Sequence, residues 1–378
     1  MKRSPNQMRL FLLAGSIWLG PLVSHATASP ATAGDARPQW QVSQSEQISF
    51  GYTDNLMLSA FAPQRSAFGQ ASAELLLLRA TQQGWAFSGF FQGNLKRFQD
   101  RDAESREQSG WFGRVESRWD ALPALSLRAI ASTFGENSLI DLSESAASRL
   151  IVLTHVQGRS ATANVRIALS PSLALVVASR PSRNEYRTFA GDFSAREHTA
   201  RLEWQLSRRI VAGIDWRELR RDYDDRCNYT AGGRALLGTH LSFWQSGGDV
   251  NLTLLLDTNG QRRLTLSAGQ TRNQDRASGY FDYRQNRSGV LLDWRAGSWR
   301  FSLDGQFKRD VFSVQTGGIG IAPPARLSAH LQTEIRLERA LSRRWSLFGT
   351  LGRDDFGGNL DEFNYIADST SFGLRYTY

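Results

Sequence analysis

The sequence has 378 residues, and 45 Lys+Arg against 36 Asp+Glu give it a formal net charge of +9. A hydrophobic content of 41% is enough to build a core, which argues against wholesale disorder. Cys227 is the single cysteine, so an intrachain disulfide and a zinc site made of cysteines are excluded. After residue 34 no apolar run approaches the roughly 18 residues of a membrane helix. A polytopic helical membrane protein is therefore excluded.

The first residues have the pattern of a targeting segment. Three basic residues precede an apolar stretch, Leu10–Val23, and the small residues Ser24 and Ala26 provide a cleavage site. This pattern predicts a secretory signal peptide over residues 1–26. The alternative is a membrane anchor, but the stretch is short and ends in small residues. Residues 27–40, rich in Ala, Thr, Ser and Pro, are predicted to form a flexible lead-in.

Alternation of apolar and polar residues dominates the rest of the chain, and this is the period of a strand with one buried face. In Trp299–Lys308, apolar residues or glycine fill every odd position and polar residues fill every even one. In chain order, the clearest such stretches are 111–120, 201–206, 250–256, 299–308 and 327–338. They predict amphipathic strands about ten to fourteen residues long.

Short turns and longer connections separate these strands. The predicted short turns are Thr81–Gly84, Ala121–Ala124, Ser170–Ser172, Ser207–Arg209, Thr258–Gln261, Ala296–Ser298 and Ser342–Arg344. The longer polar connections are Gln99–Ser109, Glu136–Gly158, Thr188–Ala195, Tyr223–Phe243, Thr316–Ala325 and Gly357–Ile366. Tight turns at one end and long loops at the other are typical of transmembrane barrels. The pattern predicts an all-β, antiparallel, up-and-down transmembrane barrel over residues 41–378, with about 16 strands and a range of 14 to 18.

A soluble β-sandwich is the alternative fold, because its strands alternate in the same way. The barrel is favoured by the heavily charged polar face, by the near absence of proline from the strands, and by tryptophans close to the short turns. The chain also ends in an alternating strand, Phe372–Tyr378, with an aromatic last residue. This strand is predicted to close the barrel against Ile48–Tyr52.

Two segments resemble known barrel proteins. Phe50–Leu56, with its Tyr52-x-Asp54-Asn55 pattern, resembles the opening segment of outer-membrane barrels from Gram-negative exopolysaccharide loci and of β-barrel porins. Phe372–Tyr378 resembles the C-terminal recognition signal of bacterial outer-membrane barrels. The resemblance implies an outer-membrane protein in contact with lipid and lipopolysaccharide, inserted by the barrel-assembly machinery through its last strand. For polysaccharide export, a periplasmic partner is also implied.

If the apolar face meets lipid, the polar face lines the lumen. Arginine dominates its positive charge, because the only lysines are Lys2, Lys96 and Lys308. Strand parity predicts these solute-lining residues: Arg114, Arg118, Arg128, Arg166, Arg201, Arg217, Arg263, Arg295, Arg300, Lys308, Arg336 and Arg375. Lys96 and Arg180 face the same way, as do ten acids: Glu74, Glu116, Asp120, Glu203, Asp215, Asp293, Asp304, Asp310, Glu334 and Glu338. The prediction is a wall of paired charges with an excess of about four positive ones.

Three functions are compatible with a lumen lined by paired charges. The first is export of an exopolysaccharide through a mildly basic lumen, since guanidinium groups pair well with carboxylates. The alternative is a general porin for small anionic solutes, and the second alternative is a closed structural or assembly barrel. Inward aromatic residues would favour stacking on sugars, and parity places Phe90 and Phe348 inward. For any single arginine, a purely structural ion pair is the competing interpretation.

Enzymatic chemistry is not predicted. Ser328 and His330 share one strand face, but the sequence around them has no nucleophile motif. Asp354 and Asp355, with acids in the next loop, are candidate cation ligands, although solvated loop acids are the preferred interpretation. No cofactor or metal is predicted. Nucleic-acid binding is rejected despite the basic charge, because the chain is predicted to be exported and its arginines are dispersed over many strands.

Overall fold

The computed structural model describes residues 40–61, 63–82, 84–99, 107–141, 151–187, 191–317 and 321–378. The predicted signal peptide and all but the last residue of the predicted lead-in lie outside these residues. No helix in the part of the chain that the structure describes has the length and apolarity needed to cross a membrane.

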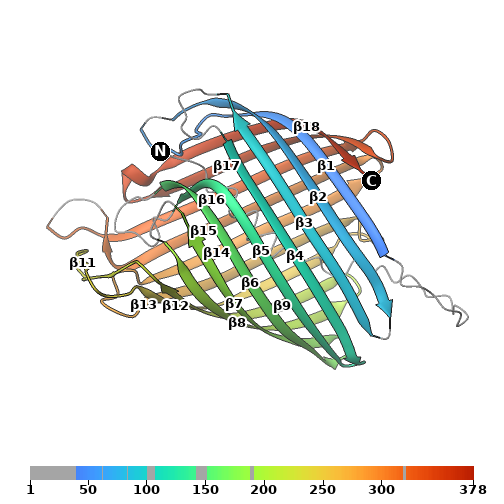
Figure 1. The fold of residues 1–378 in the computed structure, drawn as a ribbon, viewed down its shortest axis with the longest axis horizontal. Helices are drawn as coiled ribbons and strands as arrows, with labels where there is room; N and C mark the ends of the chain where they lie inside the picture. The colour runs from blue at the N-terminus through green and yellow to red at the C-terminus, as the bar shows by residue number, and fades with distance from the viewer. Residues whose placement is uncertain are drawn as a thin grey trace, which may run out of the picture.

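Sixteen strands form a closed antiparallel barrel, in which each strand pairs with its neighbours in chain order and β1 pairs with β18 (Figure 1). The strands are β1 (Trp40–Thr53), β2 (Ser66–Gln82), β3 (Trp85–Phe98), β4 (Glu107–Leu122), β5 (Leu125–Asp141), β6 (Ile151–Ser170), β7 (Leu173–Tyr186), β8 (Phe193–Ser207), β9 (Ile210–Tyr223), β12 (Ser242–Leu255), β13 (Arg262–Asp275), β14 (Tyr283–Ala296), β15 (Trp299–Thr316), β16 (Ala325–Ala340), β17 (Trp345–Gly358) and β18 (Tyr365–Thr377). A separate small hairpin, β10 (Asn228–Tyr229) with β11 (Ala235–Leu236), lies between β9 and β12. The predicted fold and strand number are confirmed.

The two ends of the barrel differ as predicted. Each of the seven predicted short turns joins two consecutive strands, and these turns lie together at one end, on the right in Figure 1. The long connections lie at the other end. Seven of the sixteen barrel strands are longer than the predicted ten to fourteen residues, up to 20 residues in β6. For this reason the connection predicted over Glu136–Gly158 begins only after Asp141 and ends before Ile151.

Contacts between strands that are not neighbours identify the lumen side. Arg166 of β6 pairs with Glu203 of β8 at 3.4 Å, across β7. Arg336 of β16 donates to Gln47 of β1 at 3.3 Å, across β17 and β18. Side chains from strands two or three apart meet only on the concave face of a closed sheet. The alternate positions, which carry Trp, Leu, Val and Phe, therefore face outward, where many of these large side chains are exposed.

The last strand closes the barrel. Antiparallel pairing of β1 with β18 runs from Ser45 opposite Thr377 to Thr53 opposite Ser369. Phe50 and Phe372 face each other in this register and are exposed on the outer wall. The predicted closure of Phe372–Tyr378 against Ile48–Tyr52 is confirmed.

Apolar packing inside the barrel lies near the long loops. The mouth cluster, which joins strands β8, β9 and β12 to the loops after β11 and β13, consists of Phe193, Ala195, Leu219, Tyr223, Leu241, Phe243, Tyr280 and Phe281. Phe281 and Leu241 are almost fully buried, at 0% and 1% exposure. The loop that carries Tyr280 and Phe281 was not among the predicted connections.

A second loop missed from the sequence, between β1 and β2, also packs on itself and on the strands. Leu56 and Met57 are buried with Phe68 and Phe98, and Leu58 is buried beside Tyr365. The Asn55 side chain holds this loop: its amide nitrogen donates to the Ser59 carbonyl at 3.0 Å and to the Ile366 carbonyl at 2.9 Å.

Asp54, next to Asn55, adds a further attachment. Its carboxylate accepts the Asp368 backbone N–H at 2.7 Å, and its own N–H donates to the Asp368 carbonyl at 3.1 Å. The Asp54-Asn55 pair of the resemblance motif therefore anchors the β1–β2 loop to β18.

Candidate functional site

All twelve basic residues predicted to line the lumen are placed on the lumen side by the strand registers. Ten of them form ion pairs within 4.0 Å: Arg114, Arg118, Arg128, Arg166, Arg201, Arg217, Arg295, Arg300, Arg336 and Arg375. Arg263 lies opposite Asp293 in the register without an ion pair among the described residues. Lys308 lies between Arg287 and His330 in neighbouring strands.

The strand registers add inward charges that the sequence analysis did not list. These are three arginines, Arg221, Arg287 and Arg326, and five acids, Glu136, Glu197, Asp249, Asp275 and Asp354. Most lie in the halves of strands next to the long loops, where the predicted strands stopped too early. Continuing the two-residue alternation into these strand halves predicts that these charged residues face inward. Three more positive and five more negative charges reduce the predicted excess from about four to about two.

Ion pairs connect neighbouring strands along the wall. Glu197 of β8 pairs with Arg180 of β7 at 2.5 Å and with Arg217 of β9 at 2.6 Å. Glu116 similarly pairs with Arg114 and Arg128. An acid shared between two arginines stabilises the register of the strands that carry them. One carboxylate neutralises only one of the two guanidinium groups, so each such group of three residues keeps one net positive charge.

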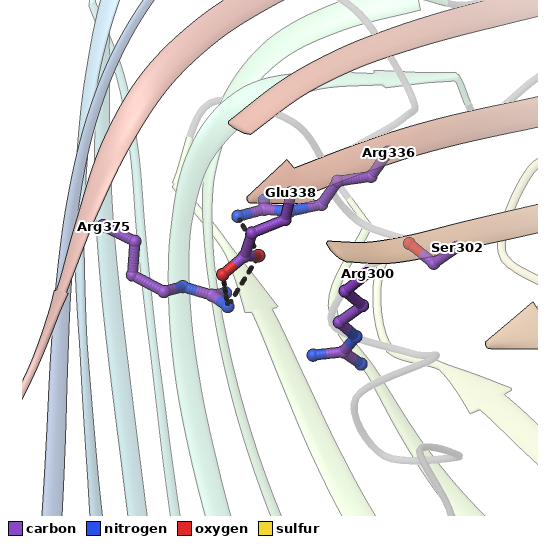
Figure 2. A pocket seen from close by; sticks show the side chains of 5 residues that line it. All are labelled: Arg300, Ser302, Arg336, Glu338 and Arg375. Carbon is purple, nitrogen blue, oxygen red and sulfur yellow. Dashed lines mark hydrogen bonds and ion pairs between the residues drawn. The ribbon is translucent and has the colours of Figure 1, made fainter. Parts of the chain in front are cut away.

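One basic cluster lies near the short turns and lines a cavity of about 130 Å³. Its walls are Arg300 and Ser302 of β15, Arg336 and Glu338 of β16, and Arg375 of β18 (Figure 2). The guanidinium groups of Arg336 and Arg375 converge on Glu338 from two sides, while Arg300 reaches toward the same space. Strands β15, β16 and β18 thus bring together three residues that are far apart in the sequence.

Each group in this arginine pocket is held in place. Glu338 accepts hydrogen bonds from Arg375 at 3.1 Å, from Arg336 at 3.2 Å and from the Ser346 hydroxyl at 2.6 Å. Arg300 donates to both carboxylate oxygens of Asp293, at 3.1 and 2.8 Å. These contacts fix the orientation of the guanidinium planes.

Unused donors remain in the pocket. A guanidinium has five N–H donors, and the bonds described above use only some of them. The Nε of Arg375 is buried and has no hydrogen-bond partner among the described residues. Three guanidinium groups around one lining carboxylate can therefore bind a carboxylate or phosphate group from a solute, with bidentate geometry.

The two aromatic residues that parity predicts to face inward differ in exposure, since Phe90 is partly exposed whereas Phe348 is covered. Phe348 is only 4% exposed, and the Arg336 guanidinium lies over its ring at 3.9 Å from the centroid. Phe90 contacts Phe112 with ring centroids 6.1 Å apart.

The polar groups weighed for catalysis or metal binding have other partners. The Ser328 hydroxyl lies 3.5 Å from Asp310, whereas His330 Nε2 is 2.5 Å from Asp354. The sequence-based interpretation of Asp354 as a solvated loop acid is wrong. It points inward, is fully buried, and also accepts a hydrogen bond from Gln332 at 3.1 Å. Asp355 points to the opposite face, so the two adjacent aspartates do not share a cation site. The described residues contain no group of three or more His, Cys, Asp or Glu side chains placed to hold a metal ion.

Comparisons with known proteins find similarity only at the level of three-dimensional structure. No family model matches the sequence, and no curated protein matches it. One similar solved structure is OccAB3 of Acinetobacter baumannii, with a TM-score of 0.48 and 6% identity over 90% of this chain and 99% of that one. Another is OccK8 (OprE) of Pseudomonas aeruginosa, with a TM-score of 0.48 and 11% identity over 90% and 98%.

A third similar structure is an anion-selective porin from Comamonas acidovorans, with a TM-score of 0.48 and 11% identity over 90% of this chain and 100% of that one. These values are too low to transfer the properties of any of the three proteins to this chain. The closed 16-stranded barrel rests on the chain's own strand pairing.

Proposed function

We propose that this protein is an outer-membrane channel for small anionic solutes. The observation that carries the proposal is the arginine pocket of Arg300, Arg336 and Arg375 on the lumen wall. Support for a membrane location comes from the outward apolar side chains, which alternate with a charged inner face around the whole barrel.

The size and chemistry of the pocket favour a small solute. A cavity of about 130 Å³ is on the order of four times the volume of a water molecule in the liquid. This is room for one anionic group with a few attached atoms. A polysaccharide pathway would gain from aromatic stacking platforms, but of the two predicted ones Phe348 is covered by Arg336 and only Phe90 is partly exposed. We therefore favour the small-solute porin over polysaccharide export.

The test is the ion selectivity of the purified protein in planar lipid bilayers. A channel of this kind conducts without a partner, and its reversal potential in a KCl gradient shows a preference for chloride. The double variant Arg336→Gln/Arg375→Gln is expected to lose most of that preference, because it removes two of the three guanidinium groups.

Arg339→Gln is the matched control. Arg339 lies on the same strand, three residues from Arg336, but it faces outward, where its guanidinium is 5.3 Å from the centroid of the Trp299 ring. The control removes the same charge from the opposite face and should keep wild-type selectivity. A barrel that inserts but does not conduct would contradict the channel. Loss of surface polysaccharide on gene deletion, without intrinsic conductance, would support the export function instead.

A further inference from the structure

Three arginines lie on the outer wall of the barrel, facing away from the lumen. Arg272 of β13 lies directly opposite Arg284 of β14, and Arg309 of β15 lies opposite Asn286, two residues along from Arg284. All three arginines are exposed, and none forms an ion pair with any described residue. We call these three residues the outer arginine row.

The row lies where the outer surface changes from mainly apolar to mixed, with the outward Val311 of β15 directly opposite Arg284. On β14, the outward residues nearer the short turns are Val290, Leu292 and Trp294, and those nearer the long loops are Ser288, Asn286 and Arg284. On β15, the outward Phe307 is followed two residues later by Arg309. In a membrane-spanning barrel, this boundary marks the depth at which hydrocarbon gives way to lipid headgroups.

Another sector of the outer wall shows how such arginines are otherwise neutralised. Arg159 of β6 lies opposite Arg183 of β7, but Glu185 pairs with both, at 3.7 and 3.6 Å. Arg220 of β9 pairs with Asp222 at 2.9 Å. This sector therefore balances its own charge.

Within the outer arginine row, Arg284 and Arg309 have no such balance, whereas Arg272 interacts electrostatically with the carboxylate of Asp282. Like charges directly opposite each other on neighbouring strands destabilise a sheet unless an anion compensates them. The nearby outward side chains are amides, and the Gln270 amide donates to Asn286 at 2.7 Å. The Asp282 carboxylate, in the adjoining loop, accepts the Asp275 backbone N–H at 2.7 Å.

We propose that Arg272, Arg284 and Arg309 bind the phosphate of an anionic lipid headgroup in the outer leaflet. The proposal rests on the outer-membrane location proposed above and adds a ligand to the outer wall. Guanidinium groups bind phosphate oxygens in bidentate pairs, and the amides of Asn286 and Gln270 can bond to headgroup hydroxyls. The apolar residues beside the row would pack against the acyl chains.

The test compares lipids that differ only in phosphate. The purified protein is titrated with diphosphorylated lipid A and with the same lipid after phosphate removal, and complexes are counted by native mass spectrometry. One arginine near an anionic lipid surface contributes about 1 kcal/mol, or about fivefold in affinity. Arg272→Gln/Arg284→Gln should therefore weaken binding of diphosphorylated lipid A roughly twenty- to thirtyfold, and binding of the dephosphorylated lipid very little.

Arg159→Gln/Arg220→Gln is the matched control, since it removes two outward arginines whose charges are already balanced. Equal binding by the Arg272→Gln/Arg284→Gln variant and the wild type, or an equal loss in the control, would overturn the proposal. Displacement of the lipid by millimolar inorganic phosphate would show a free-anion site and would overturn it too. Conductance and selectivity are measured on the same variants. Because the row faces away from the lumen, unchanged conductance separates failure of this proposal from failure of the channel function.

Discussion

Near the short turns, the lumen wall is made of arginines and carboxylates that remain partly exposed, whereas near the long loops buried aromatic and aliphatic side chains pack beside buried charges such as Asp354. The side chain of Arg300 is 40% exposed, while Phe281 is 0% exposed. The arginine region is held by directional ion pairs whose strength depends on water and salt. The mouth cluster is held by burial of apolar area, which needs no partner charge. Stability and selectivity should therefore respond to mutation in different regions.

Truncation in the mouth cluster should have the largest effect on stability. Phe281→Ala removes a fully buried ring from contact with Tyr229, Phe243 and Tyr280. The expected loss is about 3–5 kcal/mol. It should appear as a lower midpoint in heat-modifiable gel migration, with little change in ion selectivity. Phe61→Ala, at a side chain that is 78% exposed, is the control and should leave the midpoint unchanged. An equal shift in both variants would contradict the role of the cluster.

Release of the β1–β2 loop should have the next largest effect. Asn55→Ala removes two donated hydrogen bonds and the one that its side-chain oxygen accepts from the Ser59 N–H at 2.9 Å. A buried backbone group that loses its hydrogen-bond partner in this way lowers the free energy of unfolding by about 1–3 kcal/mol. The loop should become sensitive to limited proteolysis. Asn55→Asp keeps the accepted bond and loses the donated ones, so its effect should be intermediate. Protease resistance in both variants would show that the hydrogen bonds of Asn55 are not needed to hold the loop.

A charge change in the arginine pocket should shift selectivity more than stability. Glu338→Gln removes the carboxylate that pairs with Arg336 and Arg375. The neutral amide leaves both guanidinium groups in place, so the preference for chloride should increase. This is the opposite direction to the arginine variants. Reversal potentials in a KCl gradient measure the change. A fall in chloride preference would show that Glu338 serves only to position the arginines.

The smallest effect is expected at the outer rim. The Arg183 guanidinium donates hydrogen bonds to Asp224, and these lower the pKa of that carboxyl group below its usual value. A carboxyl group with a lowered folded-state pKa stabilises the protein above its unfolded pKa of about 4, and this contribution disappears as the pH falls through the folded-state pKa. Asp224→Asn should lower stability at pH 7 by less than about 1 kcal/mol. Unfolding midpoints at pH 7 and pH 3 check this, because the difference from wild type should be smaller at the lower pH.

Much of the barrel follows from local patterns. The two-residue period fixes which side chains share a face, and this rule places Arg114, Arg300 and Arg336 on the lumen side without any knowledge of strand pairing. The short turns are equally local, since a few turn residues between two alternating runs are enough to mark them. Prediction fell short where alternation weakens near the long loops. There the sequence predicts a loop at Glu136, which lies in β5, and a solvated acid at Asp354, which is fully buried.

The contacts between distant segments are decided only by closure of the sheet. Arg375 reaches Glu338 because β17 alone separates their strands, and Asn55 reaches Ile366 because the first strand pairs with the last. The two-residue alternation of the sequence predicts neither of these two contacts. The inward packing of Leu56, Met57 and Phe281 likewise depends on the space that the closed barrel leaves at its mouth. Strand faces are properties of the local backbone, whereas the partner of each charge is a property of the whole ring.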